Sequence, residues 1–104
     1  MSYCADLVDK SFFVPSEYTG RVMKKLNDCG YFVELDDDGN IVDINFSGNK
    51  LAYGEKEMFQ AIAPYVKDGS FLEMFGEDGS RWRQVFKNGT CKEIVAKTVW
   101  PNEK

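Results

Sequence analysis

The stretch that decides the fold reads YFVELDDDGNIVDINF, from Tyr31 to Phe46. Two runs of alternating, strand-prone residues, 31–35 and 41–46, flank an acidic segment that contains Asp38-Gly39. Asp-Gly between two such runs favours a hairpin turn, because glycine accepts the left-handed backbone that tight turns require. The pattern therefore predicts a β-hairpin. Its alternation is expected to place Val42, Ile44 and Phe46 on one face, and Asp43 and Asn45 on the other.

The residues before this hairpin predict a strand and then a helix. Ser11–Val14 is aromatic and β-branched and stops at Pro15, which is typical of a strand. Ser16 is a suitable N-cap for a helix that runs to about Asp28, and Gly30 is well placed to end it. The apolar stripe of this helix consists of Tyr18, Val22 and Leu26.

A loop at Gly48-Asn49-Lys50 leads to a second predicted helix, from Glu55 to Val66. Pro64 is expected to weaken its last turn, because proline cannot donate the helical hydrogen bond. The apolar stripe of this helix consists of Met58, Ile62 and Val66.

Three further strands are predicted, at 71–75, 81–86 and 91–100, with turns between them at 76–79 and 87–90. The element order is then β-α-β-β-α-β-β-β in one domain that spans residues 1–104. We expect an α+β fold of two layers, with an antiparallel sheet that carries both helices on one face. The first six elements match the ferredoxin-like order, and the last two strands would extend the sheet as a meander.

Charge and composition limit the classes of partner that this protein is expected to bind. The net charge is −4, and residues 1–54 hold nine acidic and five basic side chains. Direct binding to nucleic acid is disfavoured, because such binding depends on a basic surface that displaces counterions. Three scattered cysteines, no leader-like start and no apolar run of ~20 residues favour a cytoplasmic protein without membrane contact.

The sequence also lacks several kinds of catalytic residue. It contains no histidine, which excludes nucleophile–histidine pairs and histidine-bound zinc. Gly76-Glu77-Asp78-Gly79 carries two acids, so it is unsuited to cradling a phosphate. A carboxylate pair or a lone cysteine is the chemistry left open. We expect no enzymatic activity and no cofactor.

The first candidate binding residues are the acidic side chains of the hairpin. Glu34, Asp36, Asp38 and Gly39 have the spacing of positions one, three, five and six in a calcium-binding loop. Asn45 stands where that loop needs a bidentate glutamate, and strands rather than helices flank the segment. A solvent-exposed acidic tip is therefore the favoured interpretation. The candidate residues here are Glu34, Asp36, Asp37, Asp38 and Asp43.

The second candidate group is Arg81, Trp82 and Arg83. Strand alternation places Trp82 on one face with Gln84 and Phe86, and the two arginines on the opposite face. If Trp82 faces the helices, it belongs to the core, which is the favoured interpretation; if it faces solvent, it is an interaction anchor. The arginines are expected to pair across strands with Glu73 or Glu93.

The second half of the chain also resembles a known kind of protein. Ala61-Ile62-Ala63-Pro64-Tyr65-Val66, Asp68-Gly69-Ser70, Gly76-Glu77-Asp78-Gly79 and Trp82-Arg83 are similar to a pattern in small bacterial and phage proteins of mobile elements. Gln84 stands where that pattern has a second tryptophan. The resemblance implies a ferredoxin-like domain and no assigned activity.

These observations favour a small acidic binding protein without catalytic activity, of the kind found in phages and mobile elements. One specific hypothesis is inhibition of a host defence nuclease, such as a CRISPR effector, with the hairpin acids replacing DNA phosphates against a basic surface. A small-ligand sensor or minor enzyme, with a pocket between sheet and helices, is the first alternative. A subunit that self-associates through an open sheet edge is the second.

Overall fold

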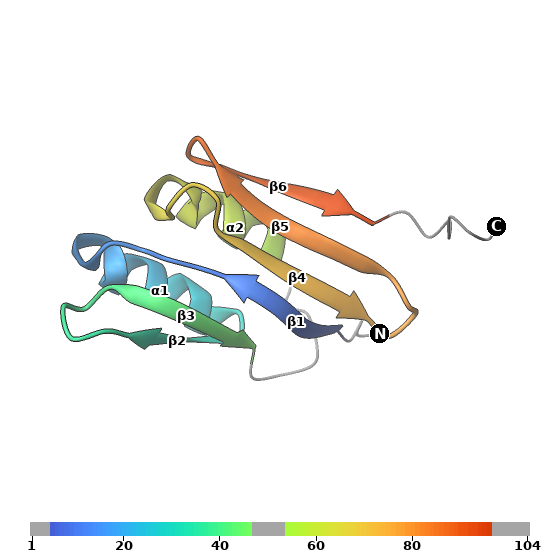
Figure 1. Cartoon of the computed structure of the whole chain (residues 1–104), viewed down its shortest axis with the longest axis horizontal. Helices are drawn as coiled ribbons and strands as arrows, with labels where there is room; N and C mark the ends of the chain where they lie inside the picture. Colours follow the sequence, from blue (N-terminus) through green and yellow to red (C-terminus); the bar gives the residue numbers. More distant parts are fainter. Residues whose placement is uncertain (1–4, 47–53, 97–104) are drawn as a thin grey trace.

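The computed structural model describes residues 5–46 and 54–96. These residues form six strands, two α-helices and two short 3₁₀ helices (Figure 1). The predicted loop at Gly48-Asn49-Lys50 and the end of the last predicted strand, 97–100, lie outside the described residues. The elements in chain order are β1 (Ala5–Ser11), η1 (Ser16–Tyr18), α1 (Thr19–Asp28), β2 (Tyr31–Leu35), β3 (Ile41–Phe46), α2 (Glu55–Ile62), η2 (Ala63–Tyr65), β4 (Phe71–Gly76), β5 (Arg81–Lys87) and β6 (Thr90–Val95).

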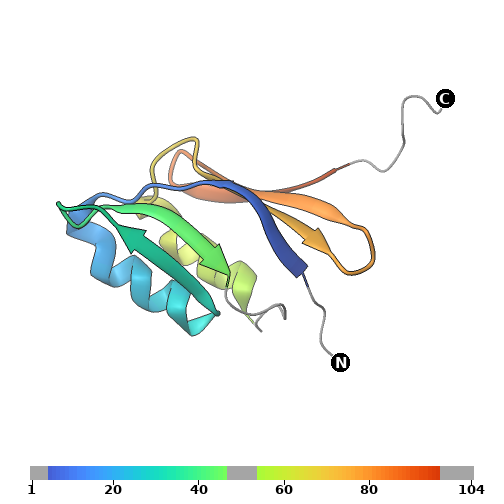
Figure 2. The ribbon, with the colours of Figure 1, turned by 60° about the horizontal axis from the view of Figure 1, so that its bottom comes forward.

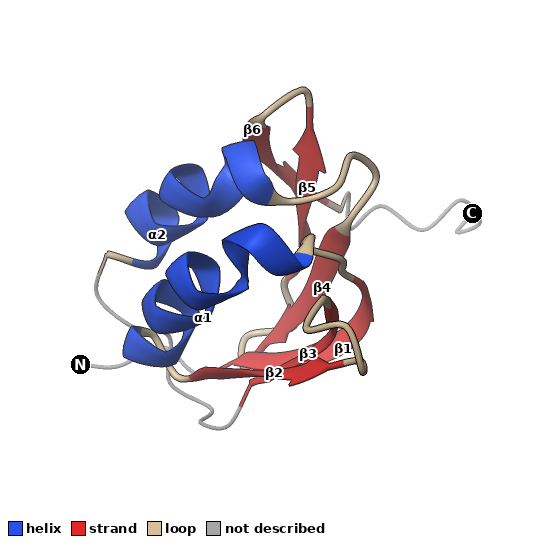
Figure 3. Cartoon of the chain, turned by 90° about the vertical axis from the view of Figure 1, so that its left-hand side faces the viewer, coloured by secondary structure: helices blue, strands red, loops and turns tan. Residues whose placement is uncertain are grey.

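The strands lie in two antiparallel sheets. Strands β1, β4, β5 and β6 form a four-stranded sheet in the order β1-β4-β5-β6, and β2 pairs with β3. One isolated antiparallel bridge joins the sheets, through hydrogen bonds of 3.0 and 2.9 Å between Val14 and Ile41. Both helices lie on the same side of the strands (Figure 3). The predicted α+β class is confirmed, while the expected sheet is divided into two.

The first strand differs from the prediction, which placed it at Ser11–Val14. Strand β1 runs from Ala5 to Ser11, and its sequence was not predicted as a strand because it contains several polar residues. After Ser11 the chain changes partner: the carbonyl of Phe13 accepts a hydrogen bond from Lys67, and Val14 pairs with Ile41. The aromatic and β-branched character of this stretch reflects burial in the core, because Phe12 and Val14 are both buried.

The first helix follows the predicted stripe but not the predicted cap. Val22 and Leu26 are fully buried, and Gly30 follows the helix with a φ of +88°. Ser16 makes no capping hydrogen bond and begins a 3₁₀ turn instead, with α1 starting at Thr19. The backbone N–H of Ser16 donates to the side chain of Asn40 at 2.8 Å, which ties this turn to the hairpin.

The second helix ends where proline requires. Helix α2 stops at Ile62, and Ala63–Tyr65 continue as a 3₁₀ turn with Pro64 at its start. Proline in that position needs no helical donor, so the weakened last turn is confirmed. The predicted end at Val66 was too late, because Val66 is already extended.

The hairpin has its predicted bounds and one irregularity. Glu34 pairs with Asp43, whereas the next residue, Leu35, pairs with Ile41. Val42 is thus an extra residue in β3, a β-bulge that reverses the alternation. Ile41 and Ile44 are fully buried while Val42 is 43 % exposed, so the expected facing of Val42 was wrong.

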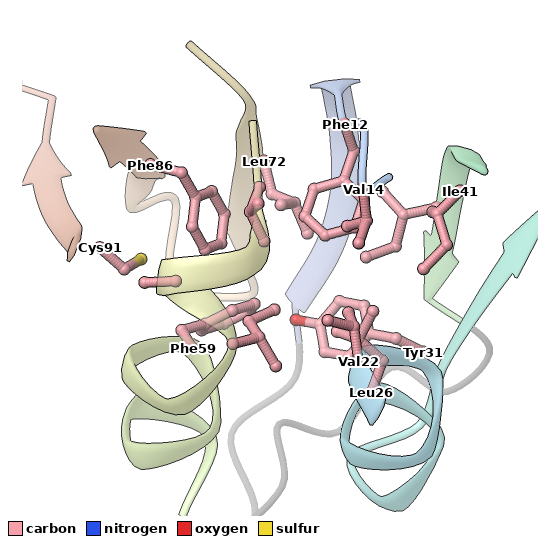
Figure 4. Packing of buried hydrophobic residues seen from close by; sticks show 14 of the residues in the cluster. Phe12, Val14, Val22, Leu26, Tyr31, Ile41, Phe59, Leu72, Phe86 and Cys91 are labelled. Carbon is pink, nitrogen blue, oxygen red and sulfur yellow. The ribbon is translucent and has the colours of Figure 1, made fainter. Parts of the chain in front are cut away.

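The core lies between the helices and both sheets (Figure 4). Tyr31 from β2 and Phe59 from α2 meet edge to face, with ring centres 5.7 Å apart. The ring centre of Phe59 in turn lies 6.1 Å from that of Phe86 in β5, and the ring centres of Phe86 and Phe12 lie 5.7 Å apart. This chain of rings connects the hairpin to the four-stranded sheet, so one core stabilises both.

Candidate protein-binding surface

The side of the four-stranded sheet that faces away from the helices is called here the outer face. Its register places side chains of β4, β5 and β6 beside one another, because paired residues point to the same side. Neither helix covers it (Figures 2 and 3). Its members on these strands are Phe71, Glu73, Phe75, Arg81, Arg83, Val85, Lys92 and Ile94.

Glu73 organises the centre of this face. Its carboxylate accepts a hydrogen bond from Nε of Arg83 at 2.8 Å and another from an Nη of Arg81 at 3.1 Å. Glu73 is 8 % exposed, whereas about half of each arginine side chain is exposed. Of the two expected partners, Glu73 bonds both arginines and holds the two guanidinium groups in defined positions, whereas Glu93 lies beside Gln84 on the opposite face and accepts its hydrogen bond.

Each arginine also lies over an aromatic ring. The guanidinium carbon of Arg83 is 4.4 Å from the ring centre of Phe71, and that of Arg81 is 5.3 Å from that of Phe75. A guanidinium at this distance is attracted by the ring electrons and covers apolar surface with its flat face. Phe75 and Ile94 nevertheless keep 38 % and 50 % of their surface exposed.

Two shallow hollows extend the outer face toward β6. The larger has a volume of about 280 Å³ and is lined by Val85, Lys92, Ile94 and residues of the β5–β6 turn. The smaller, of about 110 Å³, lies over Arg81, Arg83 and Ile94. The face is thus uneven and partly apolar, with fixed cations at its centre, which is the composition that favours protein contacts.

Trp82 lies on the helix-facing side with Gln84 and Phe86, as the alternation predicts. Gln84 and Phe86 are buried, but Trp82 is only half-buried and is not part of the core cluster. The reason lies in the shape of the sheet: the turn between β4 and β5 projects past the ends of both helices (Figure 2), and Trp82 is the second residue of the strand that follows this turn. It is neither a core residue nor a member of the outer face.

The acidic hairpin uses one of its carboxylates for its own turn. Asp36 accepts hydrogen bonds from the backbone N–H groups of Asp38 and Asn40, at 3.0 and 2.9 Å, and from the Asn40 amide at 3.0 Å. These bonds lower the pKa of Asp36 below its ordinary value, and the bond from the Asn40 side chain contributes most. Within the described residues, no cluster of three or more potential metal ligands forms.

The other hairpin acids fall into two groups. Asp43 forms an ion pair with Lys10 at 3.4 Å and accepts a hydrogen bond from the N–H of Ile44. Glu34, Asp37 and Asp38 are exposed, and within residues 5–46 and 54–96 their carboxylates form no ion pair. The structure therefore separates the predicted site residues: the hairpin acids lie on β2, on β3 and in the turn between them, and Arg81 and Arg83 lie on the four-stranded sheet.

A polar cleft marks the junction of the two sheets. It has a volume of about 410 Å³, and its lining includes Lys10, Asp43, Lys67 and Asp68. Three of these groups are engaged: Lys10 pairs with Asp43, and Asp68 accepts the N–H of Asn88 at 2.8 Å. Sequence reasoning missed this cleft, because its residues come from three distant segments.

Sequence reasoning also missed a half-buried carboxyl group, that of Glu55. The hydroxyl of Tyr31 donates to Glu55 at 2.9 Å, at the start of α2. Burial raises the pKa of Glu55 to about 7, and the nearby Glu93 contributes in the same direction. Burial also raises the pKa of the neighbouring Cys29 thiol, which makes this cysteine a weaker nucleophile at neutral pH.

No protein-family model matches the chain, and no curated protein or solved structure matches it significantly. Among the described residues, neither helix is long and apolar enough to cross a bilayer.

Proposed function

We propose that this protein is a non-catalytic binding module that docks a protein partner on the outer face of its four-stranded sheet. The observation that carries the proposal is the arrangement of Arg81 and Arg83, each over a phenylalanine ring and both bonded to Glu73. Arginine side chains held in this way lose little conformational freedom when a partner binds, which favours affinity.

The exposed apolar side chains support the same surface. Phe75 and Ile94 lie on either side of the arginines, and Ile94 lines both shallow hollows. Arginine beside partly exposed aromatic and aliphatic groups is typical of the centre of a protein interface, where aromatic residues and arginine contribute most.

The experiment compares variants in a pulldown from lysate of the bacterial host. The double variant Phe75→Thr/Ile94→Thr replaces two exposed apolar side chains with threonine, a β-branched residue that is suited to strands. We expect it to weaken capture of the partner by ~10-fold or more, while thermal unfolding shows that the fold is kept. The matched control is Phe32→Thr/Leu35→Thr, which removes exposed apolar groups from β2. If the wild type and the outer-face variant captured the partner equally well, the outer face would be excluded as the binding surface.

The acidic hairpin is a second candidate, for a partner of opposite charge. The observation in its favour is the exposure of Glu34, Asp37 and Asp38 without an ion pair in the described part of the chain. The resemblance to phage and mobile-element proteins makes a host defence nuclease, such as a CRISPR effector, the partner class to test. The carboxylates would then replace DNA phosphates against its basic surface.

A triple variant tests this candidate without disturbing the turn. Glu34→Gln/Asp37→Asn/Asp38→Asn removes three charges and leaves Asp36 in its hydrogen bonds. If the hairpin binds the nuclease, the variant loses nuclease inhibition, and wild-type binding weakens strongly with salt. Unchanged inhibition would remove the hairpin from consideration.

We also propose the ferredoxin-like arrangement for the two sheets taken together. Strand β1 pairs with β4 on one side, and the residues that follow it bridge to Ile41 of β3 on the other. These contacts support the order β2-β3-β1-β4-β5-β6, with both helices on one side. Backbone NOEs between Val14 and Ile41 in solution are the expected evidence, and their absence would separate the hairpin from the sheet.

A further inference from the structure

Charge on the outer face is divided between its two edges. At one edge, β1 carries Asp6 and Asp9, which the register places beside Phe75 and Glu73 and therefore on the same face. Both aspartates are exposed, and neither forms an ion pair within the described residues. Within the described residues these carboxylates therefore have no cationic side chain as a partner, and that of Asp9 accepts the backbone N–H of Lys10 at 2.8 Å.

The other edge carries positive charge. Lys92 of β6 is exposed and lies beside Val85, and Arg81 and Arg83 lie on the neighbouring strand. Because Glu73 is shared by the two arginines, it neutralises only part of their charge. Of the exposed apolar groups, Phe75 lies on β4, between the acidic edge and the arginines, and Ile94 lies on β6 with Lys92.

We propose that the outer face binds the outer face of a second copy of this chain, as a two-fold symmetric dimer. This inference rests on the proposed function, because it names the partner of the same surface. A face that is acidic at one edge and basic at the other is complementary to itself once it is turned over. A second copy supplies both signs of charge in the right places.

The charge pattern also selects the symmetry axis. A two-fold axis parallel to the strands places β1 of one copy over β6 of the other. The register then puts Lys92 over Ser11 of the second copy, two residues or ~6.6 Å along β1 from Asp9, a separation that the long lysine side chain can span. An axis across the strands would place β1 over β1 and bring like charges together, which is unfavourable. The first arrangement forms the Asp9–Lys92 contact twice, as symmetry requires.

The size of the face places the dimer in the class of transient interfaces. Strands ~4.8 Å apart that rise ~3.3 Å per residue give a face of roughly 19 by 20 Å, or roughly 800 Å² for two copies. This is below the ~1,200 Å² of standard interfaces and belongs to the transient class. We therefore expect reversible dimerisation with a Kd of ~10–100 μM.

Paired charge reversals test the dimer. Lys92→Glu and Asp9→Lys each place like charges at both symmetric contacts, so each variant alone should dimerise at least ~10-fold more weakly than wild type. An equal mixture of the two variants restores both contacts, because Asp9 meets Lys92 and Glu meets Lys. Sedimentation velocity from about 10 to about 500 μM, a range chosen around the expected Kd, measures all three samples. Lys24→Glu, on the exposed side of α1, is the control of equal charge change.

The proposal predicts a wild-type dimer, two weakened variants, a restored mixture and an unaffected control. A wild-type protein that stays monomeric at about 500 μM, well above the expected Kd, would overturn it, as would a mixture that stays monomeric. Growth beyond the dimer would also overturn it, because a two-fold interface closes at two copies.

The two proposals fail in different ways. A monomeric wild type whose host partner is still lost in Phe75→Thr/Ile94→Thr contradicts the dimer and leaves the binding module intact. A dimer that responds to the charge reversals, combined with partner capture that ignores the outer face, contradicts the host-partner role and leaves the dimer intact.

Discussion

At the scale of single residues, two carboxyl groups, one buried and one half-buried, have different partners. The buried Glu73 accepts hydrogen bonds from two guanidinium groups at alternate positions on β5. Glu55 lies against the hydroxyl of Tyr31 in an apolar environment, and burial favours its protonated form. The first carboxylate positions a surface, and the second makes stability depend on pH.

Glu55→Gln is expected to flatten that pH dependence. The pKa of Glu55 rises from 4.5 to about 7 on folding, so between these values the folded state binds the proton more tightly than the unfolded state. Stability therefore falls as pH rises through this window, by about 2 kcal/mol after allowance for partial exposure. Urea unfolding at pH 5 and pH 7.5 measures the slope. A variant with the wild-type slope would show that another group is responsible.

Glu73→Gln is expected to destabilise the protein by about 1–2 kcal/mol, because both arginines lose their charged partner. Unfolding in urea at neutral pH provides the comparison, with Asp37→Asn as an exposed control that also loses one negative charge. If the two variants lost equal stability, the Glu73 pair would have no special role.

At the scale of elements, the hairpin was predictable and β1 was not. Residues 31–46 combine strict alternation with an Asp-Gly turn, and both signals are local. Strand β1 contains three charged residues, and its position depends on pairing with β4, far away in the sequence. The bulge at Val42 was hidden for the same reason, because it shows only in the register of the paired strands.

In the candidate site, too, local features could be predicted from the sequence and contacts between distant residues could not. The arginine–Glu73 pairing could be predicted, since alternation alone places the three residues on one face. The separation of the hairpin acids into an Asx turn, an ion pair and an exposed group could not, because it depends on contacts with Asn40 and Lys10. Glu55 carried no signal, as its partner Tyr31 lies in another element.

Asp36→Ala is expected to lower the midpoint of thermal unfolding, because two backbone N–H groups of the hairpin turn lose their acceptor. Asp37→Ala, one residue further along the exposed turn, is expected to change stability by less than about 0.5 kcal/mol. Thermal unfolding of both variants provides the test. Equal effects would mean that the turn depends on total charge and not on this side chain.

At the scale of the whole molecule, two sheets share one core. The rings of Tyr31, Phe59, Phe86 and Phe12 contact one another in sequence from the hairpin to the four-stranded sheet. Only one bridge joins the backbones of the two sheets in the described part of the chain. Side-chain packing must therefore supply most of the coupling between them.

This coupling predicts a single cooperative unfolding transition. In a urea titration followed by NMR, the amide signals of Val33 in β2 and Val85 in β5 should lose intensity with the same midpoint. An earlier midpoint for Val33 would show that the hairpin unfolds by itself and that the ring contacts do not bind the two sheets into one unit.

The position of β1 also has a consequence for the time that folding takes. The hairpin and the β4–β5–β6 meander join neighbouring segments, which pair in microseconds. Strand β1 must instead find β4, whose paired residues lie roughly 60 to 70 positions away along the chain. Closing so long a loop costs entropy before any contact forms, and distant pairing slows folding. Strand β1 is therefore expected to pair last, after the hairpin and the meander have formed. Its pairing with β4 is expected to limit the folding rate.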